Sequence, residues 1–248
     1  MMKDSNREVG QPKFYELSIS ERHAWLVNHG FITGETIKQL SGVNGLSSEQ
    51  ANHMIENVIG VFSLPIGIAQ NFIVNQREVL IPMVVEEPSV VAGASYMAKL
   101  ARPSGGFIAE TTEPEMIAQI QVLDLTDMNG AKDKLLDHRD KLLQLAGRVD
   151  PVLVKCGGGP RDLEVRIIED SPIGSFLVVH LIFDVRDAMG ANAVNSAAEA
   201  LAPEIEKISG GRVHLRILSN LADRRLAKAR VTILKDQLVF QHYAAEEV

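Results

Sequence analysis

The pattern of hydrophobic and polar positions changes character near Thr111. Beyond that point, apolar and polar residues alternate in short runs, which is the period of half-buried β-strands. Residues 116–125 show the alternation clearly, with Ala118, Ile120 and Val122 on one face and two glutamines on the other. The alternation predicts four strands, at 116–125, 163–168, 176–185 and 212–218.

Two helical patterns separate these strands. One spans 131–146 and is charged and amphipathic. The other lies within 187–208, where Pro203 is expected to bend or break the helix and two glycines end it. The order strand–helix–strand–strand–helix–strand is that of a split βαβ, or ferredoxin-like, unit. No Rossmann glycine fingerprint accompanies it.

The first hundred residues carry shorter helical patterns and one hairpin. Helices are predicted near 17–26 and 35–40, a third opens at Ser47 and continues to Val58, and a hairpin loop lies at 75–78. Near the other end, 220–229 predict a helix and 230–233 a strand that returns to this first part. Residues 1–13 are polar and are expected to be disordered.

These elements predict an α+β fold with two domains. An α-rich large domain would comprise 14–110 and 220–248, arranged around a central helix. The ferredoxin-like (βαββαβ) small domain would be inserted into it at 111–219.

The central helix follows the sequence Glu86-Glu87-Pro88-Ser89. Proline has the φ angle of a first helical turn and lacks an N–H that would be unpaired there, so a helix should begin near Pro88. Its interior is unusually rich in small residues, and Gly93 costs about 1 kcal/mol relative to alanine in a helix. We therefore expect a buried helix with another backbone or a flat ligand lying close against it.

Composition narrows the function classes. The chain has 248 residues, a net charge of -7 and a sequence pI near 5.5, which argue against a general nucleic-acid binder. The single cysteine excludes an internal disulfide and indicates a reducing compartment. No apolar run is long enough for a membrane span and no signal sequence is recognisable, so we expect a cytoplasmic protein. The seven histidines show no metal-ligand spacing, so no metal site is expected.

Three motifs, in this order, carry a resemblance to a known family. They are Glu56-Asn57-Val58-Ile59-Gly60, Glu87-Pro88-Ser89-Val90-Val91-Ala92 and Asp187-Ala188-Met189-Gly190-Ala191-Asn192. Together they resemble the bacterial class II form of 3-hydroxy-3-methylglutaryl-coenzyme A (HMG-CoA) reductase, over about 14–237. The resemblance implies interconversion of HMG-CoA and mevalonate with release of coenzyme A, through two hydride transfers from a nicotinamide cofactor. It also implies a homodimer or higher oligomer with the active site at the subunit interface.

The resemblance assigns roles to three residues near the substrate. Glu87 matches the catalytic acid that protonates the carbonyl oxygen, although the residue pattern alone favours a carboxylate stabilised by the helix dipole. Ser89 matches a contact to the carboxylate of the HMG group, where simple helix capping is the alternative. Asn220 matches a position lining the substrate site, and a helix N-cap is the alternative there.

The resemblance also assigns a cofactor site. Asp187, Met189, Gly190, Ala191 and Asn192 match the family's dinucleotide motif, and the small residues permit close approach of a phosphate at a helix N-terminus. A plain capped turn would explain the same pattern without a ligand.

Asp150 matches an aspartate that favours NAD over NADP, because a carboxylate accepts from a ribose hydroxyl and repels a 2′-phosphate. Arg148 would weaken this preference, and NADP remains possible. Gly157-Gly158-Gly159 lack the lysine and hydroxyl of a P-loop and predict a tight turn before a strand, with a role beside the cofactor as the alternative.

The family's catalytic lysine, its paired aspartate and its histidine match no position up to Val248. Without the ammonium group a reductase would lose about a hundred- to a thousandfold in rate, so we expect this chain alone to be inactive. An alternative is a non-catalytic remnant that binds dinucleotide or dimerises. A further alternative, on fold analogy alone, is a ferredoxin-like regulatory domain that binds a small metabolite.

Overall fold

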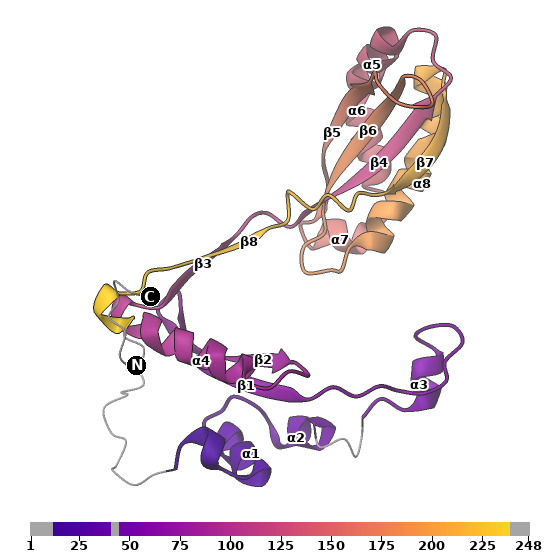
Figure 1. The fold of residues 1–248 in the computed structure, drawn as a ribbon. Coiled ribbons are helices and arrows are strands. Elements are labelled where there is room, and N and C mark those ends of the chain that lie inside the picture. The colour runs from indigo at the N-terminus through magenta and orange to yellow at the C-terminus, as the bar shows by residue number, and fades with distance from the viewer. Residues whose placement is uncertain (1–11, 41–44, 239–248) are drawn as a thin grey trace. The chain divides into compact units, whose positions relative to one another are not determined.

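The computed structural model describes residues 12–40 and 45–238 of the chain (Figure 1). The chain divides into two compact units, one formed by 1–107 with 231–248 and the other by 108–230. The domain boundary expected after 219 therefore lies after 230, within the segment 230–233 that was expected to return to the first unit. Two expectations, the disorder of 1–11 and the end of the second helix at Ser41-Gly42, fall outside the described residues.

The unit formed by 108–230 contains a four-stranded antiparallel sheet in the order β5-β6-β4-β7. This order, with one helical connection on each side of the β5–β6 pair, is the ferredoxin-like arrangement that the sequence predicts. The strands are β4 (Glu115–Leu123), β5 (Gly159–Ile168), β6 (Phe176–Asp184) and β7 (Arg212–Leu218).

The helices of this unit pack on one face of the sheet and enclose its core. They are α5 (Met128–Asp137), α6 (Arg139–Ala146), α7 (Pro151–Lys155) and α8 (Ala191–Ser209). The predicted inward face of β4 is confirmed, because Ala118, Ile120 and Val122 are fully buried among side chains of β6 and α8. Every second residue of the strands faces this core, and the buried side chains along one face of α8 pack against them.

Two helix predictions in this unit need correction. The segment 131–146 forms two helices instead of one, and His138 between them bonds the carbonyl of Lys134 through both its backbone N–H and its ring Nδ1. Pro203, which was expected to bend or break the helix, does not break α8, because the helix continues to Ser209. It lies on the exposed face, where the carbonyl that loses its N–H partner can meet water, while buried Leu201 and Ile205 hold the opposite face.

The predicted helix at 220–229 is wrong. The chain is irregular there and then forms β8 (Ala227–Val231). The Leu226 N–H donates to the Thr112 hydroxyl, and the Thr112 N–H donates to the Leu226 carbonyl. These bonds tie the residue before β8 to the residue after the distant strand β3 (Phe107–Thr111), so tertiary contacts outweigh helix propensity here.

The other unit begins with short helices. They are η1 (Phe14–Glu16), α1 (Ile19–Asn28), α2 (Gly34–Leu40) and α3 (Ser48–Asn52). Ser18 and Ser47 cap α1 and α3 through capping boxes, the first being one of the two serines, Ser18 and Ser20, that the sequence offers as a cap. However, α3 ends at Asn52, and Met54 and Ile55 that were expected on it are exposed.

The hairpin of this unit carries the central helix. Strands β1 (Ile66–Val74) and β2 (Arg77–Val84) pair antiparallel around Asn75-Gln76, both with positive φ, which suits a two-residue hairpin turn. A bulge in β1 places Asn71 so that its amide donates to the Ser95 carbonyl of α4 (Val90–Ala101). The helix is thereby fixed against β1.

The expectation of a fully buried central helix is wrong for the single chain. Ala98 and Ala101 are buried against the hairpin, but Met97 on the other side is 46% exposed. A Cβ built on Gly93 would meet nothing within 4 Å, so among the described residues no other backbone lies against it. The cause is that α4 is packed on one side only. Within the described residues, no helix is both long and apolar enough to cross a membrane.

Candidate functional site

The Glu87-Pro88-Ser89 segment links β2 to α4. Glu87 is exposed, and the helix begins at Val90, two residues after the predicted proline start. Ser89 precedes the helix with φ 71° and ψ -17°, a left-handed conformation that is uncommon for serine. Its side chain makes no capping hydrogen bond, so the capping alternative for Ser89 is wrong. The hydroxyl is therefore available for another partner.

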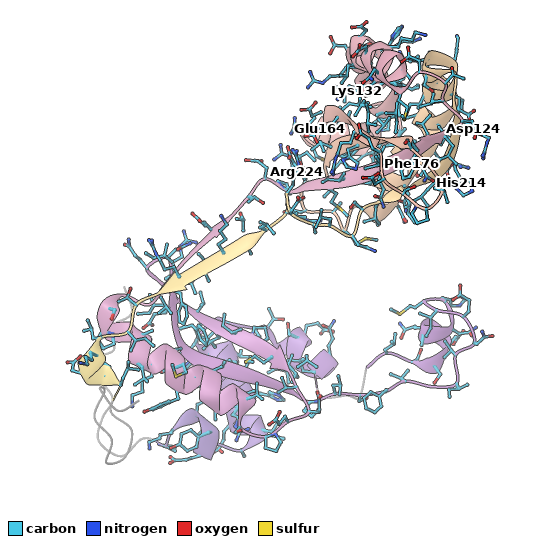
Figure 2. The ribbon with its side chains drawn as sticks, turned by 45° about the horizontal axis from the view of Figure 1, so that its top comes forward. Asp124, Lys132, Glu164, Phe176, His214 and Arg224 are labelled. Carbon is cyan, nitrogen blue, oxygen red and sulfur yellow. The ribbon has the colours of Figure 1, made fainter. Side chains whose placement is uncertain are left out.

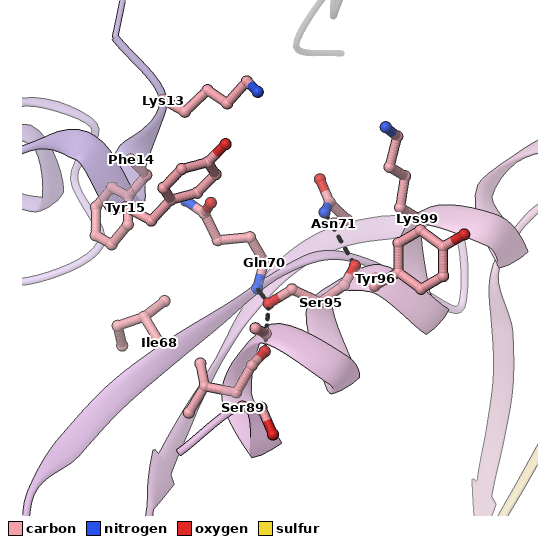
Figure 3. A pocket seen from close by; sticks show the side chains of 12 residues that line it. Lys13, Phe14, Tyr15, Ile68, Gln70, Asn71, Ser89, Ser95, Tyr96 and Lys99 are labelled. Atoms are coloured by element: carbon pink, nitrogen blue, oxygen red, sulfur yellow. Dashed lines mark hydrogen bonds between the residues drawn. The ribbon is translucent and has the colours of Figure 1, made fainter. Parts of the chain in front are cut away.

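A pocket of about 640 Å³ lies beside Ser89 within this unit (Figure 3). Its walls come from η1, β1 and α4, and most of its side chains are polar. The Ser95 hydroxyl donates to the Val91 carbonyl and accepts from the Gln70 N–H, so this part of the wall is fixed. The lining includes the cations and hydroxyls of Lys13, Tyr15, Ser89, Tyr96 and Lys99. Such a lining suits an anionic organic ligand with an apolar portion.

In the other unit, the predicted cofactor motif forms the turn between β6 and α8. Gly190 has φ +92°, and a Cβ there would lie 2.6 Å from Met116 Sδ and 2.7 Å from Val185 Cγ1. Only glycine fits this position. Helix α8 has no side-chain cap, so its first N–H groups are open to a ligand. Asp187, Met189 and Asn192 are exposed around the turn, and Ala191 begins the helix.

Asp150 caps α7, because its Oδ1 accepts from the Leu153 N–H at 2.9 Å. Pro151 occupies the first helical position. This capping role was not predicted from the sequence. Capping engages one carboxylate oxygen and leaves the negative charge in place, so a role toward a ribose stays a prediction.

The glycine run forms the predicted tight turn. Gly157 and Gly159 have φ +85° and +104°, and a Cβ on Gly158 would lie 2.8 Å from the Asp184 carbonyl oxygen. The turn is thus pressed against the end of β6.

A buried charge cluster beside this turn escaped the sequence analysis. Asp184 is 1% exposed; it accepts from Arg161 Nη2 at 2.6 Å and from the Arg186 backbone N–H at 3.0 Å, and the Arg186 guanidinium forms an ion pair with it at 3.0 Å. Both arginines also donate to the Gly157 carbonyl. Burial alone would raise the pKa of Asp184, but the hydrogen bonds and charges of Arg161 and Arg186 hold that pKa below its usual value. The only sequence signal was an aspartate ending an apolar strand.

Asn220 is exposed and does not cap a helix, because no helix follows it. Its carbonyl accepts from the Ala222 N–H at 3.0 Å. Among the predicted site residues, Glu87 and Ser89 belong to one unit, whereas Asp150, the 187–192 turn and Asn220 belong to the other. In the described part of the chain, no three acidic, histidine or cysteine side chains group in a way that would hold a metal ion.

Comparison with known proteins identifies the family. The sequence profile of hydroxymethylglutaryl-coenzyme A reductase matches residues 18–248. The chain belongs to this family. It is 50% identical over 225 residues to 3-hydroxy-3-methylglutaryl-coenzyme A reductase of Archaeoglobus fulgidus, which covers 91% of this chain and 51% of that protein. A probable HMG-CoA reductase of Borreliella burgdorferi is 33% identical over 193 residues, or 77% of this chain and 42% of that protein.

Solved structures agree. HMG-CoA reductase of Streptococcus pneumoniae superposes with a TM-score of 0.87 at 36% identity, covering 94% of this chain and 63% of that one. The class II enzyme of that organism bound to NADPH in open conformations gives 0.85 at 37% identity, covering 91% and 61%. The expected resemblance to class II HMG-CoA reductase is confirmed. The chain spans about half the length of the curated relatives it matches.

Proposed function

We propose that this chain supplies the substrate pocket and the cofactor turn of an HMG-CoA reductase. The reaction would convert HMG-CoA, two reduced nicotinamides and two protons into mevalonate, coenzyme A and two oxidised nicotinamides. The observation that carries the proposal is the pocket beside Ser89, which adjoins the segment with the acid expected from the resemblance.

Each part of the substrate has a candidate partner. Glu87 would donate the proton that the carbonyl oxygen needs as hydride arrives, since a positioned acid lowers the barrier of such a step. The Ser89 hydroxyl and the adjacent start of α4 would take the terminal carboxylate of the HMG group. Lys13 and Lys99 line the same pocket and carry the positive charge that a coenzyme A phosphate requires.

The 187–192 turn would hold the dinucleotide. Two features support binding at this turn. An added Cβ on Gly190 would collide with Met116 and Val185, and the N-terminus of α8 has no side-chain cap. A bound nicotinamide supplies the hydride. Asn220 would contact the substrate from the same unit.

Asp150 would set the preference between the two cofactors. Its charge would favour NADH, while a structural neighbour of the same class is NADPH-bound. Asp150→Asn tests this sharply, because asparagine caps a helix as well as aspartate does but carries no charge. We expect the variant to bind NADPH about fivefold more tightly, from about 1 kcal/mol of relieved repulsion near 4 Å. Equal NADPH affinities in the two proteins would remove Asp150 from the site.

We further propose that the chain pairs with a second copy through 54–66. This segment exposes apolar side chains, with Ile59 at 105% and Phe62 at 87% exposure. Large apolar residues gathered in one exposed segment mark interaction surfaces in folded proteins. Light scattering after gel filtration should give a dimer, and Phe62→Ser should shift it toward the monomer. A monomeric native chain would contradict the pairing.

Ligand titration tests the main proposal. The purified chain should bind NADPH, seen in nicotinamide fluorescence, and HMG-CoA, seen by calorimetry. Ser89→Ala should weaken HMG-CoA binding about fivefold or more while leaving NADPH binding unchanged, as expected for one lost hydrogen bond to a charged group. If either NADPH or HMG-CoA failed to bind, the proposal would be refuted. Binding of both without mevalonate formation, in a parallel assay, would match the expectation that the chain alone is inactive and favour the binding-module alternative.

A further inference from the structure

The segment 219–226 is pinned to the ferredoxin-like unit by two successive arginines. The Arg224 guanidinium donates to Glu164 Oε1 at 2.6 Å and lies 3.6 Å from Glu115 Oε2 (Figure 2). The Thr112 hydroxyl donates to the Arg224 carbonyl at 2.9 Å. Arg224 thus fixes the backbone of this segment beside β4 and β5. Arg225 is then presented from an anchored position.

Arg225 makes contacts of another kind. Its Nη2 donates to the Ala188 carbonyl at 3.1 Å, and its Nη1 donates to the Met189 carbonyl at 3.3 Å. Nη1 also lies 3.7 Å from Met116 Sδ, the atom that closes the space beneath Gly190. The planar fork of one guanidinium therefore holds two consecutive carbonyls of the turn that opens α8.

The planar trans geometry of the peptide bond determines which way the N–H groups of the turn point. Each peptide unit is planar and trans, so an N–H points away from the carbonyl that precedes it. With the Ala188 and Met189 carbonyls held toward Arg225, the N–H groups of Met189 and Gly190 point to the opposite side. In the described part of the chain, neither N–H donates to another backbone group. They therefore have no backbone acceptor and can donate to a ligand on the side away from Arg225.

We propose that Arg225 is a positioning residue that aims the 187–190 turn at its ligand. The ligand is the anionic dinucleotide of the proposed function, and the inference rests on that function for its identity. Arg225 would act through the Ala188 and Met189 carbonyls that it holds. Because the segment of Asn220 carries this arginine, the cofactor turn and a candidate substrate residue are tied to one another.

The test compares Arg225→Ala with Arg225→Lys and with Arg212→Ala in the full chain. Arg212 is a matched control, because it is an exposed arginine of the same unit that pairs with Asp124 and does not contact the turn. Hydrogen exchange of a peptide covering 186–192 is measured without ligand, and the NADPH dissociation constant and melting temperature are measured in parallel.

We expect Arg225→Ala to raise exchange in 186–192 and to weaken NADPH binding about tenfold, since two hydrogen bonds from a charged donor are lost. Melting should change little. Lysine has one donor head and should restore only part of the affinity, whereas millimolar guanidinium ion should restore binding to the alanine variant. The control should match the native chain in all measurements.

The outcomes separate this inference from the proposed function. Unchanged exchange in 186–192 would overturn the positioning role, whatever the cofactor does. If Arg225→Ala raised exchange but left the NADPH affinity unchanged, the positioning role would also be overturned, because binding would then not depend on how the turn is held. If Arg225→Ala raised exchange but the native chain bound no NADPH, the role of Arg225 in holding the turn would stand and the proposed function would be refuted.

Discussion

Replacing Gly190 by alanine is the sharpest test of the turn between β6 and α8. The residue has φ +92°, where an L-amino acid costs about 1–2 kcal/mol. The added Cβ would also lie 2.6 Å from Met116 Sδ, 2.7 Å from Val185 Cγ1 and 2.8 Å from Val185 Cβ. Two separate penalties therefore act at one position.

The size of the second penalty depends on which neighbour can move. Met116 is unbranched and can swing its sulfur aside at small cost. Val185 cannot, because it is β-branched, fully buried and held by a backbone bond from its N–H to the Pro114 carbonyl. Overpacking of this kind costs about 1–3 kcal/mol, so Gly190→Ala should lose about 2–5 kcal/mol in total.

Gly210→Ala separates the two penalties. Gly210 lies at the other end of α8 with φ +74°, and a Cβ there would meet nothing within 4 Å. It should show the backbone cost alone, about 1–2 kcal/mol. Urea unfolding followed by far-UV circular dichroism, with hydrogen exchange of β6 amides to report on this unit alone, measures both variants. If Gly190→Ala were no less stable than Gly210→Ala, the close packing beneath the turn would be refuted.

Four further variants follow from the structure. The pKa of Asp184 is lowered in the folded chain, so its stabilising effect is present above the unfolded pKa near 3.9 and is lost as the pH falls through the folded pKa. Asp184→Asn should remove this loss of stability at acid pH, measured by urea unfolding at several pH values. An unchanged pH profile would contradict the pairing of Asp184 with the two arginines. Burial, followed by the charge of Arg166, lowers the pKa of His180, so the free energy of unfolding should fall as the pH drops below about 6.5. His180→Gln should reduce this decline. Equal slopes of unfolding free energy against pH in the two proteins would disprove the role of His180. Gly93→Ala should raise the unfolding free energy by about 0.5–1 kcal/mol because a Cβ there meets nothing within 4 Å, and a loss of stability would show that something covers α4. Ser89→Gly should raise stability by relieving the left-handed φ while weakening HMG-CoA binding in calorimetry; a variant that binds like the native chain would exclude the hydroxyl from the site.

The ferredoxin-like unit could be predicted because its local patterns and its tertiary contacts agree. Alternation along 116–125 placed Ala118, Ile120 and Val122 inside, and these three residues are fully buried. Gly210 ends α8 in a left-handed conformation, as the glycine pair indicated. Where each strand has one face against helices, the period of two fixes the register, and little else is needed.

The failures occurred where a distant partner decided the local structure. The segment 220–229 has helical composition, yet Leu226 pairs with Thr112 and the chain enters β8 instead of a helix. The Asp184 cluster was missed partly for the same reason, because Arg161 of β5 meets Asp184 only when β5 and β6 pair. A pattern along one segment contains no information about such partners. The role of α7 was missed differently: a five-residue helix is too short to show a period, and only the Asp150 cap marks it.

The left-handed residues show which part of the candidate site local physics leaves unexplained. Asn75 and Gln76 form a hairpin turn that requires positive φ, and the amide of Asn71, at the bulge, bonds α4. Arg186 is held by bonds to Asp184. Ser89 has the same strain without a capping bond from its side chain, and it lines the pocket of its unit. Strain that no local contact offsets tends to be kept where a ligand uses the resulting geometry. The backbone at Ser89 thus supports the proposal that the start of α4 binds the substrate, and Ser89→Gly tests that proposal by separating stability from binding.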